Sequence, residues 1–207
     1  MTYLTEQEAF WAGEFGIDYL KRNQGEEMIR QNINLFSKIL TFAPDVKSIV
    51  ELGCNIGMNL AALKRISADF KLRGYEINAE ASKLAQEQGV GEIINTTIIN
   101  PLSNEATFDL AFTKGVLIHI SPDHLEKVYE NLVALSHRYI LVSEYYNPSP
   151  DRVTYRGHED RLFKRDFAGE LMDKYHLKLI AYGFNYRRDN YIPGDDCTWF
   201  LLEKNSY

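Results

Sequence analysis

The sequence predicts an α/β fold with a doubly wound, mostly parallel sheet that carries helices on both faces. Three observations predict this class. Short apolar runs typical of buried strands alternate with helical patterns along the 207 residues. The first run, Ser48–Leu52, ends at a glycine-containing turn that leads into a helix. All six prolines fall at boundaries between the proposed elements, where strands and helices end.

Residues 1–45 are predicted to form helices outside the sheet. Thr5 and Glu8 have the spacing of a capping box, which starts a short aromatic helix through Trp11 and Phe15. A second helix follows, and Pro44 ends it. One face of that helix has apolar residues at helical spacing: Ile29, Ile33, Phe36 and Leu40. We therefore expect a packing helix and an N-terminal lid ahead of the sheet.

Six further strands complete the predicted sheet. They cover residues 70–77, 92–98, 108–113, 139–145, 177–184 and 197–203. Helices are expected over Met58–Ile66 and over 79–88, where Asn78 is the N-cap. Another helix starts at Ser121-Pro122-Asp123, because a hydroxyl, a proline and an acid are each favoured in a first turn. Ligands of such sheets bind beyond the carboxyl ends of the strands.

The composition is that of an ordinary globular protein, with 45% apolar and 25% charged residues. The length suits one domain, residues 1–207, in which 46–207 form the core. A net charge of -6 argues against general nucleic-acid binding, and no apolar run is long enough to span a bilayer. The first twenty residues contain four acids and no lysine or arginine, and the two cysteines lie far apart. We expect a cytoplasmic protein without disulfides and, because its five histidines lack ligand spacing, without a metal.

The turn after the first strand is the most informative motif. It runs Glu51-Leu52-Gly53-Cys54-Asn55-Ile56-Gly57, and its glycines let the backbone approach a ligand at the N-terminus of a helix. A dinucleotide-binding G-x-G-x-x-G pattern would need glycine where Asn55 and Met58 stand. The turn instead resembles the E-x-G-x-G-x-G loop of class I S-adenosylmethionine-dependent methyltransferases, with Asn55 in place of the middle glycine. The alternative is a tight strand–helix turn without a ligand.

Two further features fit the same resemblance. Glu76 ends the second strand, nineteen residues after Gly57, where a carboxylate can accept hydrogen bonds from both ribose hydroxyls of a nucleoside. Residues 108–120 resemble the fourth-strand motif of these methyltransferases. The resemblance implies a Rossmann-like sheet of order 3-2-1-4-5-7-6, with strand 197–203 antiparallel, and S-adenosylmethionine as cofactor. The cofactor-binding residues expected on this basis are Trp11, Glu51, Gly53, Asn55, Gly57, Glu76, Thr97 and Thr113.

A closer resemblance covers nearly the whole chain. The segments that carry it are 8–23, 51–60, 112–121, 144–148 (E-Y-Y-N-P), 155–158 (Y-R-G-H), 162–169 (L-F-K-R-D-F-A-G) and 195–204. They are similar to the pseudaminic acid biosynthesis-associated methylases. That resemblance implies methyl transfer to a small acidic sugar or nucleotide sugar of nonulosonic acid glycan synthesis.

The long connection after the fifth strand, residues 144–166, is expected to bind this anionic acceptor. It holds a local basic cluster on an acidic protein, and arginine forks bind carboxylate or phosphate in bidentate fashion. The predicted substrate-binding residues are Tyr155, Arg156, Lys164 and Arg165, with His158 beside them. The alternative is a surface helix whose basic residues pair with neighbouring acids.

Three residues are candidates for the catalytic base. His119 follows the fourth strand, Glu144 ends the fifth, and His158 lies in the basic loop. Trp11, together with Phe15 and Tyr19, forms either a lid over the cofactor or ordinary core packing. Two other functions stay open: a scaffold that binds S-adenosylmethionine without catalysis, and a nicotinamide oxidoreductase, which the missing glycines disfavour.

Overall fold

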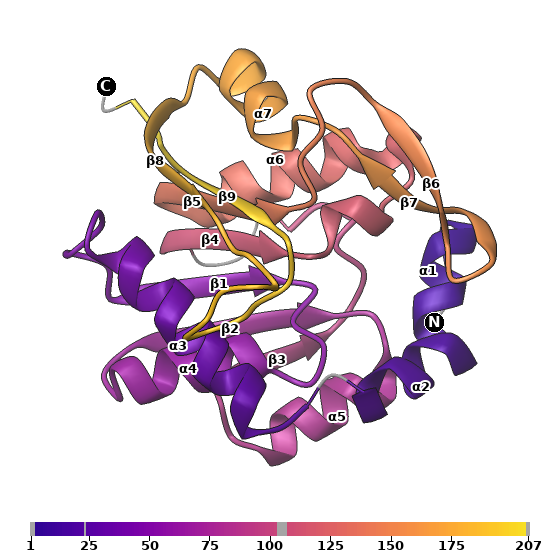
Figure 1. Ribbon diagram of the computed structural model, residues 1–207, viewed down its shortest axis with the longest axis horizontal. Coiled ribbons are helices and arrows are strands. Elements are labelled where there is room, and N and C mark those ends of the chain that lie inside the picture. The colour runs from indigo at the N-terminus through magenta and orange to yellow at the C-terminus, as the bar shows by residue number, and fades with distance from the viewer. Residues whose placement is uncertain (1–2, 23, 103–106, 206–207) are drawn as a thin grey trace.

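Seven strands form one sheet in the computed structural model, which describes residues 3–22, 24–102 and 107–205 (Figure 1). The sheet order is β3-β2-β1-β4-β5-β9-β8, and β9 runs antiparallel to both neighbours while β1 to β5 are parallel. The strands are β1 (Ser48–Leu52), β2 (Lys71–Glu76), β3 (Glu92–Asn95), β4 (Phe108–Lys114), β5 (Ser136–Glu144), β8 (Lys178–Phe184) and β9 (Thr198–Glu203). The predicted fold class, strand order and antiparallel last strand are confirmed. The ends of the predicted domain, residues 1–2 and 206–207, lie outside the described residues.

Helices cover both faces of this sheet. They are α1 (Glu6–Ala12), α2 (Glu14–Arg22), α3 (Glu26–Leu40), α4 (Met58–Ile66), α5 (Ala79–Glu87), α6 (Leu125–Leu135) and α7 (Phe167–Tyr175), with 3-10 turns η1 (Leu117–His119) and η2 (Pro122–His124). One core joins Phe36 of α3 to Phe112 of β4, and the other joins Leu132 of α6 to Val50 of β1. Because successive strand residues point to opposite faces, β1 is buried on both sides. In the part of the chain described, no helix is long and apolar enough to cross a membrane.

The N-terminal segment differs from the prediction in one respect. The single aromatic helix is two helices, because the chain becomes extended at Gly13 (φ -94°, ψ -159°). The expected cap is present, since Thr5 Oγ1 accepts from the backbone N–H of Glu8 at 3.0 Å. Similarly, the helix predicted from Ser121 begins with the 3-10 turn η2 and becomes α-helical only at Leu125.

The connection predicted as a loop is a β-hairpin. Its strands are β6 (Asp151–Tyr155) and β7 (His158–Lys164), which pair antiparallel. Arg156 (φ 50°) and Gly157 (φ 84°) form the two-residue turn between them, and left-handed backbone at both positions matches the twist of a hairpin. The hairpin extends beside α1 (Figure 1). Gln7 of α1 donates to the carbonyl of Asp160 at 3.1 Å, which joins the two elements.

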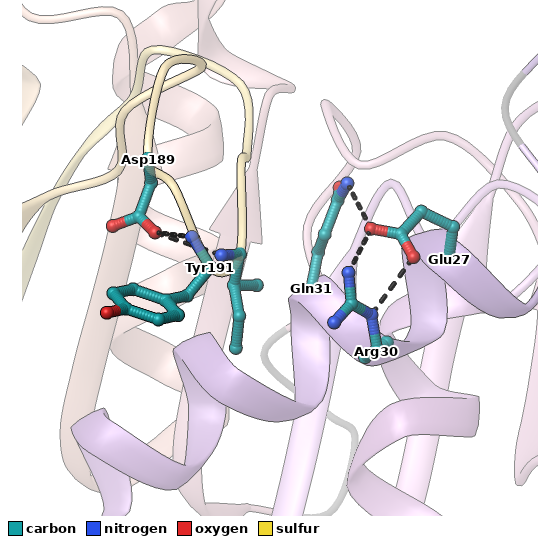
Figure 2. Close-up of polar contacts among 6 residues, drawn as sticks. Glu27, Arg30, Gln31, Asp189 and Tyr191 are labelled. Carbon is teal, nitrogen blue, oxygen red and sulfur yellow. Dashed lines mark hydrogen bonds and ion pairs between the residues drawn. The ribbon is translucent and has the colours of Figure 1, made fainter.

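In the second long connection, between β8 and β9, Asp189 fixes one turn. Asp189 accepts hydrogen bonds from the backbone N–H groups of Tyr191 (2.8 Å) and Ile192 (2.9 Å), as Figure 2 shows. These bonds lower the pKa of Asp189, and Lys38 of α3 lowers it further. Figure 2 also shows Arg30 donating to Glu27 in bidentate fashion on α3. The connection is therefore a defined turn near α3.

Candidate functional site

A cavity lies at the carboxyl edge of the sheet, where the strands point toward α1 and α2. The turns after β1, β2 and β4 form its floor, and the N-terminal helices form part of its wall. Five of the predicted site residues line it: Trp11, Gly53, Asn55, Glu76 and His119. The structure thus brings together residues from four separate segments at the place that the sheet topology predicts.

The glycine turn has the backbone geometry that its sequence predicts. Gly53 (φ 81°), Asn55 (φ 50°) and Gly57 (φ 81°) all have left-handed backbone, so Asn55 adopts the conformation of the glycine it replaces. A Cβ added to Gly53 would lie 2.7 Å from Val116, and one added to Gly57 would lie 2.8 Å from Val90. Gly57 therefore serves helix packing, and it does not line the cavity.

Glu76 links the end of β2 to this turn. Its carboxylate accepts from the backbone N–H groups of Asn55 at 2.7 Å and Asn78 at 2.8 Å. Burial raises the pKa of Glu76 despite these bonds. Each carboxylate oxygen can accept a second hydrogen bond, so Glu76 can hold the turn and still accept from ligand hydroxyls.

Glu51 has a supporting position beneath the cavity. It is fully buried, and its Oε1 accepts from Nδ2 of Asn59 at 2.5 Å. Burial raises the pKa of Glu51 to about 8. Asn59 lines the cavity and Glu51 does not, so Glu51 reaches the cavity only through its hydrogen bond to Asn59.

The N-terminal helices are fastened over the cavity by polar contacts. The Thr97 hydroxyl donates to the buried carboxylate of Glu8, which lines the cavity from α1. Nδ2 of Asn78 donates to the carbonyl of Trp11 at 3.0 Å. Thr97 itself is outside the lining. Thr97 therefore anchors α1 at the cavity, and a lid function of this segment stays a prediction.

His119 faces the cavity with a defined tautomer. Its Nδ1 lies 2.6 Å from the carbonyl oxygen of Arg161. Because a carbonyl oxygen only accepts, Nδ1 carries the proton and Nε2 is the free acceptor. Burial lowers the pKa of His119 to about 4, so the ring is neutral near pH 7. Its ring packs between Trp11 and Tyr155, with centroids 4.5 and 5.1 Å away.

The other two candidate bases lie outside the lining of the cavity. Glu144 accepts from the backbone N–H groups of Val116 (3.0 Å) and Leu117 (3.1 Å) at the start of η1. Burial raises the pKa of Glu144 to about 7. Its contacts position η1, and therefore His119, while Thr113 is buried beside it on β4. His158 is exposed, and its ring lies 5.0 Å from that of Phe10.

None of the four predicted substrate-binding residues lines the cavity. Arg165 forms an ion pair with Glu170 at 2.6 Å, and Lys164 lies over the Tyr145 ring at 5.7 Å. Tyr155 contacts His119 at the cavity wall. Arg156 is exposed at the hairpin turn, where its guanidinium lies 5.8 Å from the centre of the Tyr155 ring.

Several lining residues were not predicted to be functional. Lys114 is the last residue of β4, and Gly115 follows it. Asn59 lies in the first turn of α4, and Glu8 was expected only in a helix cap. For Lys114 and Gly115 the signal was available, since both follow a buried apolar run at the ligand-binding edge. Among the residues described, no group of three or more His, Cys, Asp or Glu side chains could hold a metal ion, and Cys54 is buried and free.

Solved methyltransferase structures have the same arrangement of elements. Magnesium protoporphyrin IX methyltransferase from Synechocystis PCC 6803, solved with S-adenosylhomocysteine, has a TM-score of 0.71 at 14% identity, over 96% of this chain and 98% of that one. A Burkholderia thailandensis 1,6-didemethyltoxoflavin N1-methyltransferase has a TM-score of 0.72 at 15% identity, over 100% and 92%. The plantazolicin methyltransferase BpumL has a TM-score of 0.68 at 14% identity, over 97% and 94%. No protein-family model matches the chain, and no curated protein does.

The likeness to these structures defines the fold. The chain has the Rossmann-like fold of S-adenosylmethionine-dependent methyltransferases, and the likeness extends over almost its whole length. At identities of 14–15% it carries no assignment of substrate.

Proposed function

We propose that this protein is an S-adenosylmethionine-dependent methyltransferase. The observation that carries the proposal is the glycine turn beside a buried acid: Gly53 and Asn55 line the same cavity as Glu76, next to the N-terminal helices. An acid at the end of β2 suits ribose hydroxyls, and a left-handed turn lets the backbone approach the rest of the ligand.

The residues present fit such a cofactor. Gly115 lines the cavity with φ 67°, and a Cβ built there would meet no atom within 4 Å, so the backbone is bare toward open space. Trp11 and Ile98 supply apolar surface, and Glu76 supplies hydrogen-bond acceptors. Bound S-adenosylmethionine supplies an activated methyl group.

His119 is the base that the geometry favours for a hydroxyl acceptor. Its Nε2 is unprotonated because Nδ1–H is held by the Arg161 carbonyl. The imidazole can therefore accept a hydrogen bond from an acceptor O–H and then its proton. A carboxylate acceptor would need no base, so the effect of removing His119 distinguishes the two kinds of acceptor.

For the acceptor, we propose a small acidic sugar or nucleotide sugar, the class implied by the resemblance to pseudaminic acid biosynthesis-associated methylases. Arg156 supports this part of the proposal. No ion pair joins it to an acid among the residues described, and its charge lowers the pKa of Tyr19, which lines the cavity. Burial, the largest effect, raises the pKa of Tyr19 to about 12. The guanidinium of Arg156, which can bind an anion in bidentate fashion, thus lies close to the rim of the cavity.

Two measurements test the proposal. Calorimetry with S-adenosylhomocysteine and with NADH identifies the cofactor, and binding of NADH alone would refute the proposal. Incubation with methyl-labelled S-adenosylmethionine and a panel of acidic sugars and nucleotide sugars then tests transfer. Label in a sugar product supports the proposed acceptor class. Cofactor binding without transfer to any member would refute that class and favour the non-catalytic scaffold.

A further inference from the structure

Lys114 is the only lysine or arginine among the described residues that line the cavity. It is the last residue of β4 and is half-buried. No ion pair joins it to an acid in the described part of the chain. An anionic ligand gains most from binding a half-buried cation that has no fixed partner in the cavity.

The strand register places Lys114 opposite Glu76 across the glycine turn. Leu52 of β1 pairs with Tyr75, and one residue further Gly53 is level with Glu76. Glu51 pairs with Phe112, and two residues further Gly53 is level with Lys114, so all three lie at one level of the sheet edge. Because β1 separates β2 from β4, the two charged residues start about 10 Å apart, or two strand spacings.

Both side chains point to the same face of the sheet. Phe112 packs in the core between the sheet and α3 and α4, and Lys114, two residues on, has the same orientation. Gly74 faces Leu60 of α4, and Glu76, two residues on, follows it. The cavity therefore has an acceptor of hydrogen bonds at one end of the turn and a cation at the other.

No neighbouring acid forms an ion pair with Lys114 among the residues described. Glu51 is close enough for Lys114 to act on its pKa, but burial keeps that pKa near 8. Burial likewise raises the pKa of Glu76, and the Glu8 carboxylate is bonded to Thr97. Because this pKa of Glu51 lies above 7, Glu51 is mostly protonated near neutral pH and offers Lys114 no ionised partner.

We propose that Lys114 binds the carboxylate at the amino-acid end of S-adenosylmethionine, and that Glu76 and Lys114 together orient the cofactor across Gly53. This inference rests on the proposed function and adds the residue that reads the anionic end. A nucleoside with a short chain ending in a carboxylate has hydroxyl donors and an anion at opposite ends, as the two side chains require.

The test compares two ligands that differ only in the carboxylate. S-adenosylhomocysteine has it, and S-adenosyl-3-thiopropylamine lacks it. By calorimetry, we expect the unmodified protein to bind the first about ten-fold to a hundred-fold more tightly, the range for a charge-assisted hydrogen bond. Lys114→Met should abolish this preference and leave the affinity for the second ligand unchanged, and Lys114→Arg should keep part of it. Lys47→Met is the matched control, since Lys47 is exposed just before β1 at the opposite edge.

The outcomes separate this inference from the proposed function. If neither ligand binds the unmodified protein, the proposed function fails and the inference fails with it. If both bind equally, or if Lys114→Met keeps the preference for S-adenosylhomocysteine, the cofactor site stands and the role of Lys114 is refuted. Thermal melting of each variant shows whether it is folded, and Lys114→Arg provides the test should Lys114→Met not fold.

Discussion

Replacing Glu76 by glutamine tests the centre of the proposed cofactor site. The carboxylate accepts from two backbone N–H groups, at 2.7 and 2.8 Å. A glutamine has one acceptor oxygen, so it can satisfy either Asn55 or Asn78 and must turn its NH₂ group toward the other. One buried donor then loses its partner, which costs about 1–3 kcal/mol of unfolding free energy.

The same substitution should weaken cofactor binding. A ribose hydroxyl that faces the glutamine NH₂ group loses its acceptor oxygen, which costs about 1–3 kcal/mol, or roughly five-fold to 150-fold in Kd. Calorimetry with S-adenosylhomocysteine measures this change, and urea unfolding measures the stability. Glu80→Gln is the control, because Glu80 is exposed in the first turn of α5.

The result that would refute the reasoning is an unchanged Kd in Glu76→Gln. The two N–H bonds would then be the whole role of Glu76, and the acid would belong to the fold alone. A loss of stability without a loss of affinity would lead to the same conclusion. A loss of affinity in Glu80→Gln of similar size would mean that general charge, and not this carboxylate, is measured.

Three further predictions concern the base, the lid and the rim. His119 has a folded pKa of about 4, below its ordinary value of 6.5, so the stability that the neutral ring contributes is complete above pH 6.5 and is lost as pH falls toward 4. His119→Asn should remove about 2 kcal/mol of this pH dependence between pH 7 and pH 4.5, measured by urea unfolding at the two pH values. If instead wild type and variant change in parallel, His119 is not buried neutral. Thr97→Val removes a hydrogen-bond donor from the buried Glu8 carboxylate, so it should cost about 1–3 kcal/mol of unfolding free energy and raise the Kd for S-adenosylhomocysteine. An unchanged Kd would show that the N-terminal helices do not affect cofactor binding. Arg156→Lys should raise the KM for an acidic acceptor and leave cofactor affinity unchanged, since a lysine keeps the charge and loses the fork; a normal KM with lower thermal stability would assign Arg156 to the hairpin alone.

Local patterns were enough to predict the strands of the sheet and the glycine turn. Strand β1 and the turn at Gly53–Gly57 are encoded in neighbouring residues, because burial on both faces demands a continuous apolar run and left-handed angles demand glycine or asparagine. The position of Glu76 beside this turn was also predictable, since parallel strands bring their carboxyl ends to one edge. The strand order came from the resemblance to methyltransferases and was confirmed by the register.

Contacts between distant segments were decided only by the tertiary structure. The hairpin β6–β7 packs beside α1, and this brings the Arg161 carbonyl to His119 and sets the tautomer of the ring. Glu144 has a carboxylate at a strand end, as a base would, yet η1 takes up its oxygens. The spacing of residues along the chain carries no information on such pairings, because burial and hydrogen-bond partners depend on which segments meet in space.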